Sequence, residues 1–155
     1  MSEQPTAQPI SSFLHDWILE QGGDPADLEC RDNNGETVLL RAARNGDSNV
    51  VRSLIQAGVA INARNNDGNT ALWFACFRNH LDLIEILTQA GIDVNNQNEN
   101  GVTVLMYAAS ADKTQMVEVL LAKGADPQLK NLDDFRAIDF ASNRDILRML
   151  KHATL

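Results

Sequence analysis

The side chains best suited to acid–base chemistry at neutral pH are the three histidines, His15, His80 and His152. They lie near the start, in the middle and near the end of the chain, so they cannot meet in the elongated array that the periodicity described below predicts. Catalysis requires acid, base or nucleophile groups that converge on one substrate. The glycines are single and periodic, unlike the clustered glycines of the phosphate-binding motifs GxGxxG and GxxxxGK[ST]. We therefore expect neither an enzyme nor a bound cofactor.

The two cysteines, Cys30 and Cys76, do not form a CxxC pair and have no histidine-rich neighbourhood. We therefore expect neither a metal site nor a disulfide framework, and the thiols are typical of a reducing compartment. The longest unbroken apolar run, from Ala71 to Phe77, is too short to cross a bilayer. The first twelve residues lack the basic start and the apolar core of a secretory signal. These features predict a cytoplasmic protein.

The net charge of −8 and the isoelectric point near 4.7 argue against binding to nucleic acid or to an anionic membrane as the main role. The charge is unevenly distributed along the chain. Residues 1–30 contain six acidic residues and no lysine or arginine, whereas the remainder contains 15 acidic and 13 basic residues.

A 33-residue period dominates the chain from about residue 32 to residue 152. Glycines recur at positions 35, 68 and 101, and threonines recur at positions 37, 70 and 103. Apolar residues continue the pattern in three further rows: Leu39, Leu72, Leu105 and Ile138; Ala42, Ala75, Ala108 and Ala141; Leu54, Leu87 and Leu120. Such a period indicates stacked supersecondary units that bury one continuous core.

The pattern predicts that each unit is a tight turn followed by two helices. The turn glycine follows Asn or Asp, and the threonine two residues later is suited to cap the first helix. A small alanine allows neighbouring first helices to approach closely. The second helix carries apolar residues at helical spacing and ends at a further glycine, as at Gly58, Gly91 and Gly124.

This pattern resembles the ankyrin repeat, in which a projecting β-turn finger precedes two antiparallel helices. The resemblance implies an all-α solenoid and a role in binding other proteins. Two features depart from the family pattern. The proline after the threonine is replaced by Val38, Ala71, Val104 and Ala137, and the following histidine position holds Leu40, Trp73, Met106 and Asp139. Both losses predict an array that is less stable than an idealised one.

We expect residues 1–9 to be a disordered tail and residues 10–155 to form one ankyrin repeat domain. Within the domain, residues 10–31 are predicted to be a half-repeat cap whose helix begins after Ser11 or Ser12 and ends at Gly22-Gly23. Three full repeats follow at residues 32–64, 65–97 and 98–130. Residues 131–155 are predicted to be a degenerate C-terminal cap, because Asp134 replaces the turn glycine, Arg136 replaces the threonine, and three residues are missing between the helices.

The first helix of each unit carries the candidate partner-binding residues of the concave face. Phe77 occupies a position that the family exposes, and Arg44 and Arg78 surround it with positive charge. We expect substitutions of Phe77, Arg44 and Arg78 to leave the fold intact. Phe74 and Tyr107 could either pack between neighbouring helices or contact a partner, and the sequence does not decide between these roles. We expect Trp73 to pack beneath the fingers. The complete set is Arg41, Arg44, Asn45, Phe74, Phe77, Arg78, Tyr107 and Ser110.

The finger tips are the second candidate surface. They change from polar to more apolar along the array, ending with Leu132, Asp133 and Phe135. Because Asp134 adopts the glycine turn at a cost, we expect the last finger to be distorted and to fold Leu132 and Phe135 under. The candidate residues on the other fingers are Asn66, Asp67, Asn69, Glu99, Asn100 and Val102.

The function predicted from these features is a non-catalytic protein–protein interaction module, acting as a stand-alone adaptor or regulator. A preformed concave surface spares the cost of ordering the site on binding. The alternatives are a dedicated inhibitor or assembly factor of one enzyme and, more distantly, a regulator associated with nucleic acid, which only the basic cluster at Arg41, Arg44 and Arg78 favours. The expected partner is a protein with an acidic patch, not a membrane, and the chain alone is expected to be monomeric.

Overall fold

A computed structural model describes residues 10–153 as an elongated stack of helices. Within this range there are nine α-helices and no β-strand, which confirms the predicted all-α solenoid. The tail predicted for residues 1–9 lies outside the described residues. The helices are α1 (Ser12–Glu20), α2 (Val38–Asn45), α3 (Ser48–Gln56), α4 (Ala71–Phe77), α5 (Leu81–Gln89), α6 (Val104–Ser110), α7 (Thr114–Ala122), α8 (Ala137–Phe140) and α9 (Arg144–Ala153).

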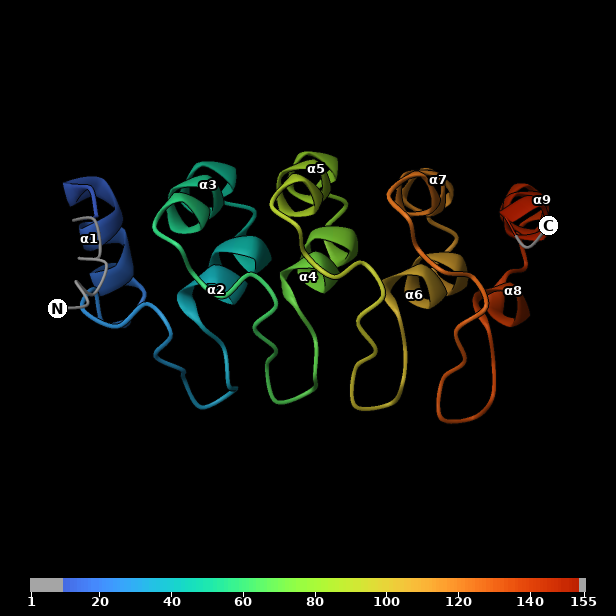
Figure 1. Cartoon of the computed structure of the whole chain (residues 1–155), viewed down its shortest axis with the longest axis horizontal. Coiled ribbons are helices and arrows are strands. Elements are labelled where there is room, and N and C mark those ends of the chain that lie inside the picture. Colours follow the sequence, from blue (N-terminus) through green and yellow to red (C-terminus); the bar gives the residue numbers. More distant parts are fainter. Residues whose placement is uncertain (1–9, 154–155) are drawn as a thin grey trace, which may run out of the picture.

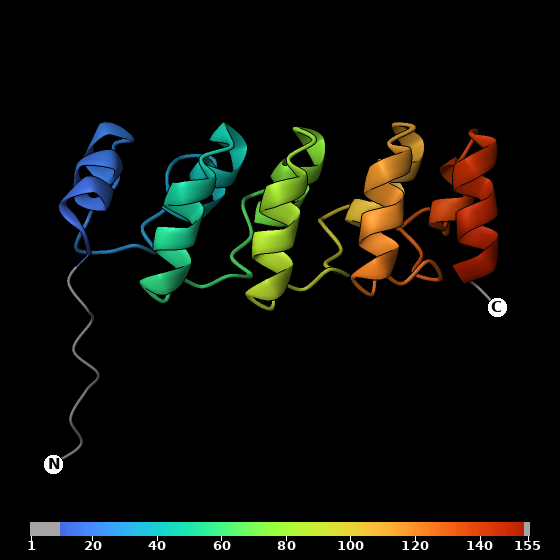
Figure 2. The same cartoon turned by 90° about the horizontal axis from the view of Figure 1, so that it is seen from above.

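The helices form two rows, with the fingers extending from one side of the stack (Figure 1). The inner row, next to the fingers, contains α2, α4, α6 and α8, and the outer row contains α1, α3, α5, α7 and α9. The view from above shows the outer helices side by side in chain order (Figure 2). Surfaces on the inner row and the fingers are therefore continuous along the stack.

Helix capping follows the sequence in most units. Thr37 and Thr103 accept hydrogen bonds from the backbone N–H groups of Leu40 and Met106, at 3.4 and 3.2 Å. Thr70 makes no such bond, although its backbone has the same extended conformation. The predicted threonine cap is thus confirmed in the first and third repeats and absent from the second.

The core runs without interruption from one end of the stack to the other. The periodic leucines Leu39, Leu72 and Leu105 are buried, and the periodic alanines Ala42, Ala75 and Ala108 have no exposed surface. An alanine at each position allows the inner helices to lie close together, because any larger side chain would meet the neighbouring helix.

Helix α1, in the segment predicted to be the N-terminal cap, packs into the same core as the first repeat. Ser11 accepts a hydrogen bond from Leu14 N at 3.2 Å and begins α1, which buries Leu14, Trp17 and Ile18. Trp17 Nε1 also donates to Asp47 Oδ2 at 3.3 Å, immediately before α3. The cap therefore covers apolar surface and also satisfies a polar group at the start of the next outer helix.

The last finger differs from the expectation. Asp134 adopts a φ of 69°, and its N–H donates to Asn131 O at 3.0 Å, as Gly101 N donates to Asn98 O at 2.8 Å in the preceding finger. The predicted distortion is wrong because aspartate tolerates this left-handed conformation better than most residues. Leu132 and Phe135 are consequently not folded under, and remain 76% and 49% exposed.

Candidate partner-binding surface

The concave face of the second and third repeats carries a cluster of aromatic rings flanked by positive charge. We call Trp73, Phe77, Arg78, Tyr107 and Lys113 the aromatic–cation patch. Tyr107 lies in contact with two rings from the preceding inner helix: its centroid is 4.8 Å from that of Trp73 and 6.0 Å from that of Phe77. Phe77 is 53% exposed, whereas Trp73 and Tyr107 are half-buried. The exposed ring of Phe77 thus contacts Tyr107, which in turn contacts Trp73.

Lys113 and Arg78 provide the positive charge of this patch. Lys113 Nζ donates to Asn79 Oδ1 at 2.5 Å and to Phe77 O at 3.4 Å, and lies 6.0 Å from the Tyr107 ring centroid. Arg78 is exposed, and its side chain makes no hydrogen bond or ion pair within residues 10–153. Sequence reasoning did not select Lys113, which lies one period after His80 in the short connection between the two helices of its unit. Its hydrogen bonds to Asn79 and Phe77 depend on the stacking of two repeats.

Arg44 has a different role from the one predicted. Its guanidinium forms an ion pair with the carboxylate of Glu36, whose side chain is completely buried. Neither Glu36 oxygen has a hydrogen-bond donor in good geometry, so Arg44 is the principal compensation for this buried charge. Arg44 also lies over the ring of Phe74, with 5.2 Å between Cζ and the ring centroid. These contacts lead us to predict that replacing Arg44 lowers stability, contrary to the expectation from the sequence.

Arg41 is likewise occupied by contacts within the chain. Its guanidinium donates to Asp32 Oδ2 and to the backbone carbonyl of Gln21. These contacts tie α2 to the N-terminal cap and leave Arg41 only half exposed. Asn45 is exposed at the end of α2, where its Nδ2 lies 3.5 Å from Gln21 Oε1. The positive charge that the first repeat offers a partner is thus smaller than its sequence suggests.

The fingers are joined to one another through their backbones. Asn66 N donates to Asn34 O at 3.0 Å, and Glu99 N donates to Asp67 O at 3.0 Å. Asn69 is buried, and its Oδ1 accepts a hydrogen bond from Asn98 Nδ2 at 3.2 Å. Asn69 therefore holds two fingers together and does not present its side chain to a partner.

The other predicted finger residues are accessible to different degrees. Asn66, Asp67, Glu99 and Asn100 are exposed, and Val102 is half-buried. Glu99 forms an ion pair with Arg64 at 3.2 Å. On α6, Ser110 is exposed and its Oγ donates to Tyr107 O at 2.8 Å. These exposed side chains extend the candidate surface from the inner helices to the finger tips.

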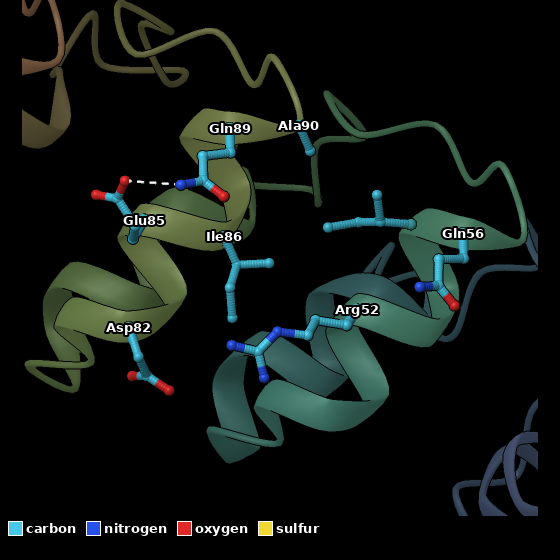
Figure 3. A pocket seen from close by; sticks show the side chains of 8 residues that line it. Arg52, Gln56, Asp82, Glu85, Ile86, Gln89 and Ala90 are labelled. Atoms are coloured by element: carbon cyan, nitrogen blue, oxygen red, sulfur yellow. Dashed lines mark hydrogen bonds between the residues drawn. The ribbon is translucent and has the colours of Figure 1, made fainter.

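On the opposite side of the stack, a groove of about 550 Å³ separates α3 from α5 (Figure 3). Its walls carry Arg52, Ile55 and Gln56 from α3, Asp82, Glu85, Ile86 and Gln89 from α5, and Ala90 directly after α5. The hydrogen bond from Ser48 is the largest cause of the lowered pKa of Asp82. The hydrogen bond from Lys123 is the largest cause of the lowered pKa of Glu85. Hydrogen-bonded carboxylates of this kind favour a structural role for the groove over acid–base chemistry.

Groups suited to catalysis or metal binding are not brought together in the described part of the chain. Residues 10–153 contain no group of three or more His, Cys, Asp or Glu side chains placed to hold a metal ion. Burial raises the pKa of Cys76 to about 12, although the charge of Lys113 opposes this shift. The Cys76 thiol is therefore protonated and unreactive at neutral pH. Across the same residues, no helix combines the length and the apolar character that crossing a membrane requires.

Comparison with known families agrees with this geometry. A model of ankyrin repeats in three copies matches residues 11–98, and a second model of multiple ankyrin repeats matches residues 86–141. The chain therefore belongs to the ankyrin repeat family, whose members generally serve as protein–protein interaction modules and are typically not catalytic. No curated protein matches the chain significantly.

Proposed function

We propose that this protein is a non-catalytic adaptor or regulator that binds a partner protein through the concave face of its inner helices and fingers. The observation that carries the proposal is the aromatic–cation patch. Phe77 is one of the few large apolar side chains that residues 10–153 leave exposed, and it lies on Tyr107 beside Arg78 and Lys113. Aromatic and arginine side chains are the residues that most often anchor protein interfaces.

The electrostatics of the patch favour an acidic partner surface. The chain as a whole carries a net charge of −8, yet Arg78 and Lys113 place positive charge beside the exposed ring. A partner carboxylate paired with Arg78 would form a charge-assisted hydrogen bond, and an apolar partner side chain would cover Phe77. A positive patch on an acidic protein also disfavours partners that are basic throughout.

The size of the face is adequate for one protein partner. A standard interface covers about 800 Å² on each side, which corresponds to most of the inner-helix and finger surface of the three full repeats. The patch lies within one chain, so the partner can bind without a second copy. The free thiols Cys30 and Cys76 are consistent with a cytoplasmic location, which we include in the proposal.

Affinity purification of the full chain, with identification of co-eluting proteins by mass spectrometry, tests this proposal. The informative comparison is between the wild type, Phe77→Ala and the control Phe13→Ala, which removes an aromatic ring of similar exposure from α1, away from the patch. We expect a partner that is retained by the wild type and by Phe13→Ala and lost with Phe77→Ala. A partner retained equally by all three would exclude the patch as the binding site.

The purified partner then distinguishes an adaptor from a dedicated inhibitor or assembly factor. If the partner is an enzyme, its activity is measured with and without saturating amounts of the wild type. Unchanged activity supports an adaptor, and loss of activity that depends on Phe77 supports the inhibitor. A patch that binds nucleic acid and no protein would overturn both.

A further inference from the structure

The groove between α3 and α5 shows how consecutive outer helices face each other in this stack (Figure 3). The forward face of α3 presents Ser48, Arg52 and Ile55, and the rear face of α5 presents Asp82, Glu85 and Ile86. Ser48 Oγ donates to Asp82 Oδ2 across this junction. Ser48 thus donates across the junction to Asp82, whereas Glu85 pairs with Lys123 of the following unit.

The repeat period identifies the corresponding faces at the two ends of the molecule. Two 33-residue periods before Asp82, Glu85 and Ile86 lie Asp16, Leu19 and Glu20 of α1. Three periods after Ser48, Arg52, Ile55 and Gln56, allowing for the three-residue deletion in the last unit, lie Arg144, Arg148, Lys151 and His152 of α9.

Burial supports this alignment. Trp17 and Ile18 of α1 correspond to Leu83 and Ile84 of α5, and all four are buried. Ile146 and Leu150 of α9 correspond to Val50 and Leu54 of α3, and these are buried as well. Figure 1 places α1 and α9 at opposite ends of the stack. From the repeat alignment and the buried residues, we infer that the faces assigned to α9 and α1 point away from the stack.

These end faces are opposite in charge and accessible. Asp16, Leu19 and Glu20 are exposed at one end, and Arg144, Arg148, Lys151 and His152 are exposed at the other. The side chain of Asp16 makes only a 3.5 Å contact with His15, and the side chains of Arg144 and Arg148 have no hydrogen bond or ion pair within residues 10–153. The exposed face of α9 therefore carries cations, and the exposed face of α1 carries carboxylates.

We propose that α9 of one copy docks against α1 of a second copy, so that the protein associates head to tail. In this contact Arg144 and Arg148 face Asp16 as Ser48 and Arg52 face Asp82, and Lys151 faces Glu20 beside Leu19. Contacts between two α1 faces or two α9 faces bring like charges together, so the head-to-tail arrangement is selected. This inference differs from the monomer expected from the sequence.

The finger edge is consistent with a contact made by the outer helices alone. A Cβ atom on Gly101 would lie 2.9 Å from Leu132 N of the following finger, so close finger packing requires glycine at this position. The last finger has Asp134 there, and the N-terminal cap contributes no finger of its own to pack against it. The α9–α1 contact therefore does not require the terminal finger to be covered.

The area of the contact sets its strength. One helix pair buries much less than the ~800 Å² per partner of a standard stable interface, so the association is weak and depends on charge. A head-to-tail contact does not close on itself, so it produces open chains whose length increases with concentration. The contact leaves the concave face uncovered, and the proposed partner site and self-association are independent.

Sedimentation of the full chain over a range of concentrations tests the proposal. At an ionic strength of about 0.01 M, where the Debye length is about 30 Å, we expect the average mass to rise above the 17.0 kDa of one chain. At about 1 M, where the Debye length is about 3 Å, we expect a monomer at every concentration. A monomer under both conditions at the highest soluble concentration would overturn the proposal.

Charge reversal identifies the faces. Variant one carries Asp16→Lys and Glu20→Lys, and variant two carries Arg144→Glu and Arg148→Glu; circular dichroism checks that both are folded. Each variant alone should remain monomeric at low ionic strength, because its two ends then have like charge. A mixture of the two should associate again, as should a chain that carries all four changes.

The control is Asp67→Lys with Glu118→Lys, which changes the net charge as in variant one at exposed positions away from the ends. It should associate like the wild type. If the control also becomes monomeric, net charge and not the end faces governs association, and the proposal fails. It fails equally if mixing the two variants restores nothing.

Discussion

Removal of the Arg44 charge should destabilise the protein substantially, because Glu36 would then be a buried carboxylate without a cation. The substitution Arg44→Met keeps a long apolar side chain over Phe74 and removes only the charge. Breaking a buried ion pair from one side costs ~3–5 kcal/mol. Arg44 is 41% exposed whereas Glu36 is fully buried, so water can partly replace the lost cation, and we expect a value near the lower limit, about 3 kcal/mol.

Urea unfolding followed by circular dichroism measures this loss. With a slope of about 1–3 kcal/mol per molar urea, a loss of about 3 kcal/mol lowers the midpoint by roughly 1–3 M with an unchanged slope. A domain typically has a total stability of ~5–15 kcal/mol, so the variant should remain folded but marginal. Arg44→Glu, which brings a second carboxylate against Glu36, should be worse.

The matched comparison is the same substitution in a Glu36→Gln background. A neutral amide at position 36 no longer requires a cation, so Arg44→Met should cost about 1 kcal/mol or less there, in the range of an ordinary hydrogen bond. The difference between the two backgrounds is the coupling between the residues. Equal and small losses in both backgrounds would show that Arg44 does not compensate a buried charge, and the reasoning would be refuted.

Three further predictions concern the surface, the core thiol and the cap. Phe77→Ala should weaken partner binding, measured by titration calorimetry, by about 2 kcal/mol or more without lowering the unfolding midpoint, as expected of an exposed anchor; a variant that melts early would make Phe77 a core residue. Cys30 should react with a thiol reagent in the native state and Cys76 only on unfolding. The pKa of Cys76 is about 12 in the folded state and 9.0 for an unperturbed thiol, so its contribution to the free energy of unfolding is complete below pH 9.0 and is lost as the pH rises toward about 12. The variant Cys76→Ala should not show this part of the loss of stability at alkaline pH. Deletion of residues 10–31 exposes the surface covered by Trp17 and Ile18 and should cause aggregation or loss of cooperative unfolding in light scattering and urea titration; a monomeric truncated chain of unchanged stability would contradict the cap.

Much of the fold is predictable because its determinants are local and repeat. The leucine and alanine rows specify which helix faces meet, and the turn glycines specify where each unit begins. Asp134 misled the prediction, because the sequence shows the missing glycine but not the free space beside the last finger, where a side chain is tolerated. At Thr70 the repeat pattern predicts a cap that the structure lacks: the same residue type at the same position of the unit makes no cap hydrogen bond.

The candidate surface is predictable only in part. The position of Phe77 in the repeat correctly placed an exposed ring on the concave face, and the aromatic row correctly placed Tyr107 near it. The roles of Arg41 and Arg44 were not predictable, because their partners Asp32 and Glu36 belong to a finger whose side-chain directions the repeat pattern does not reveal. Lys113 was missed because its contact with Tyr107 depends on the conformation of the helix–helix connection.

The glycine in the fingers also determines where this array can grow by duplication. A Cβ on Gly35 or Gly101 would lie within 3 Å of the following finger, so each finger that accepts a successor must keep glycine at this position. A unit inserted between two existing fingers, after Gly35 and before residue 131, would have a compatible finger on both sides. One added after the last finger would meet Asp134 and would require a mutation there first. The fingers that carry glycine can therefore accept a following finger as they stand, whereas the finger that carries Asp134 cannot.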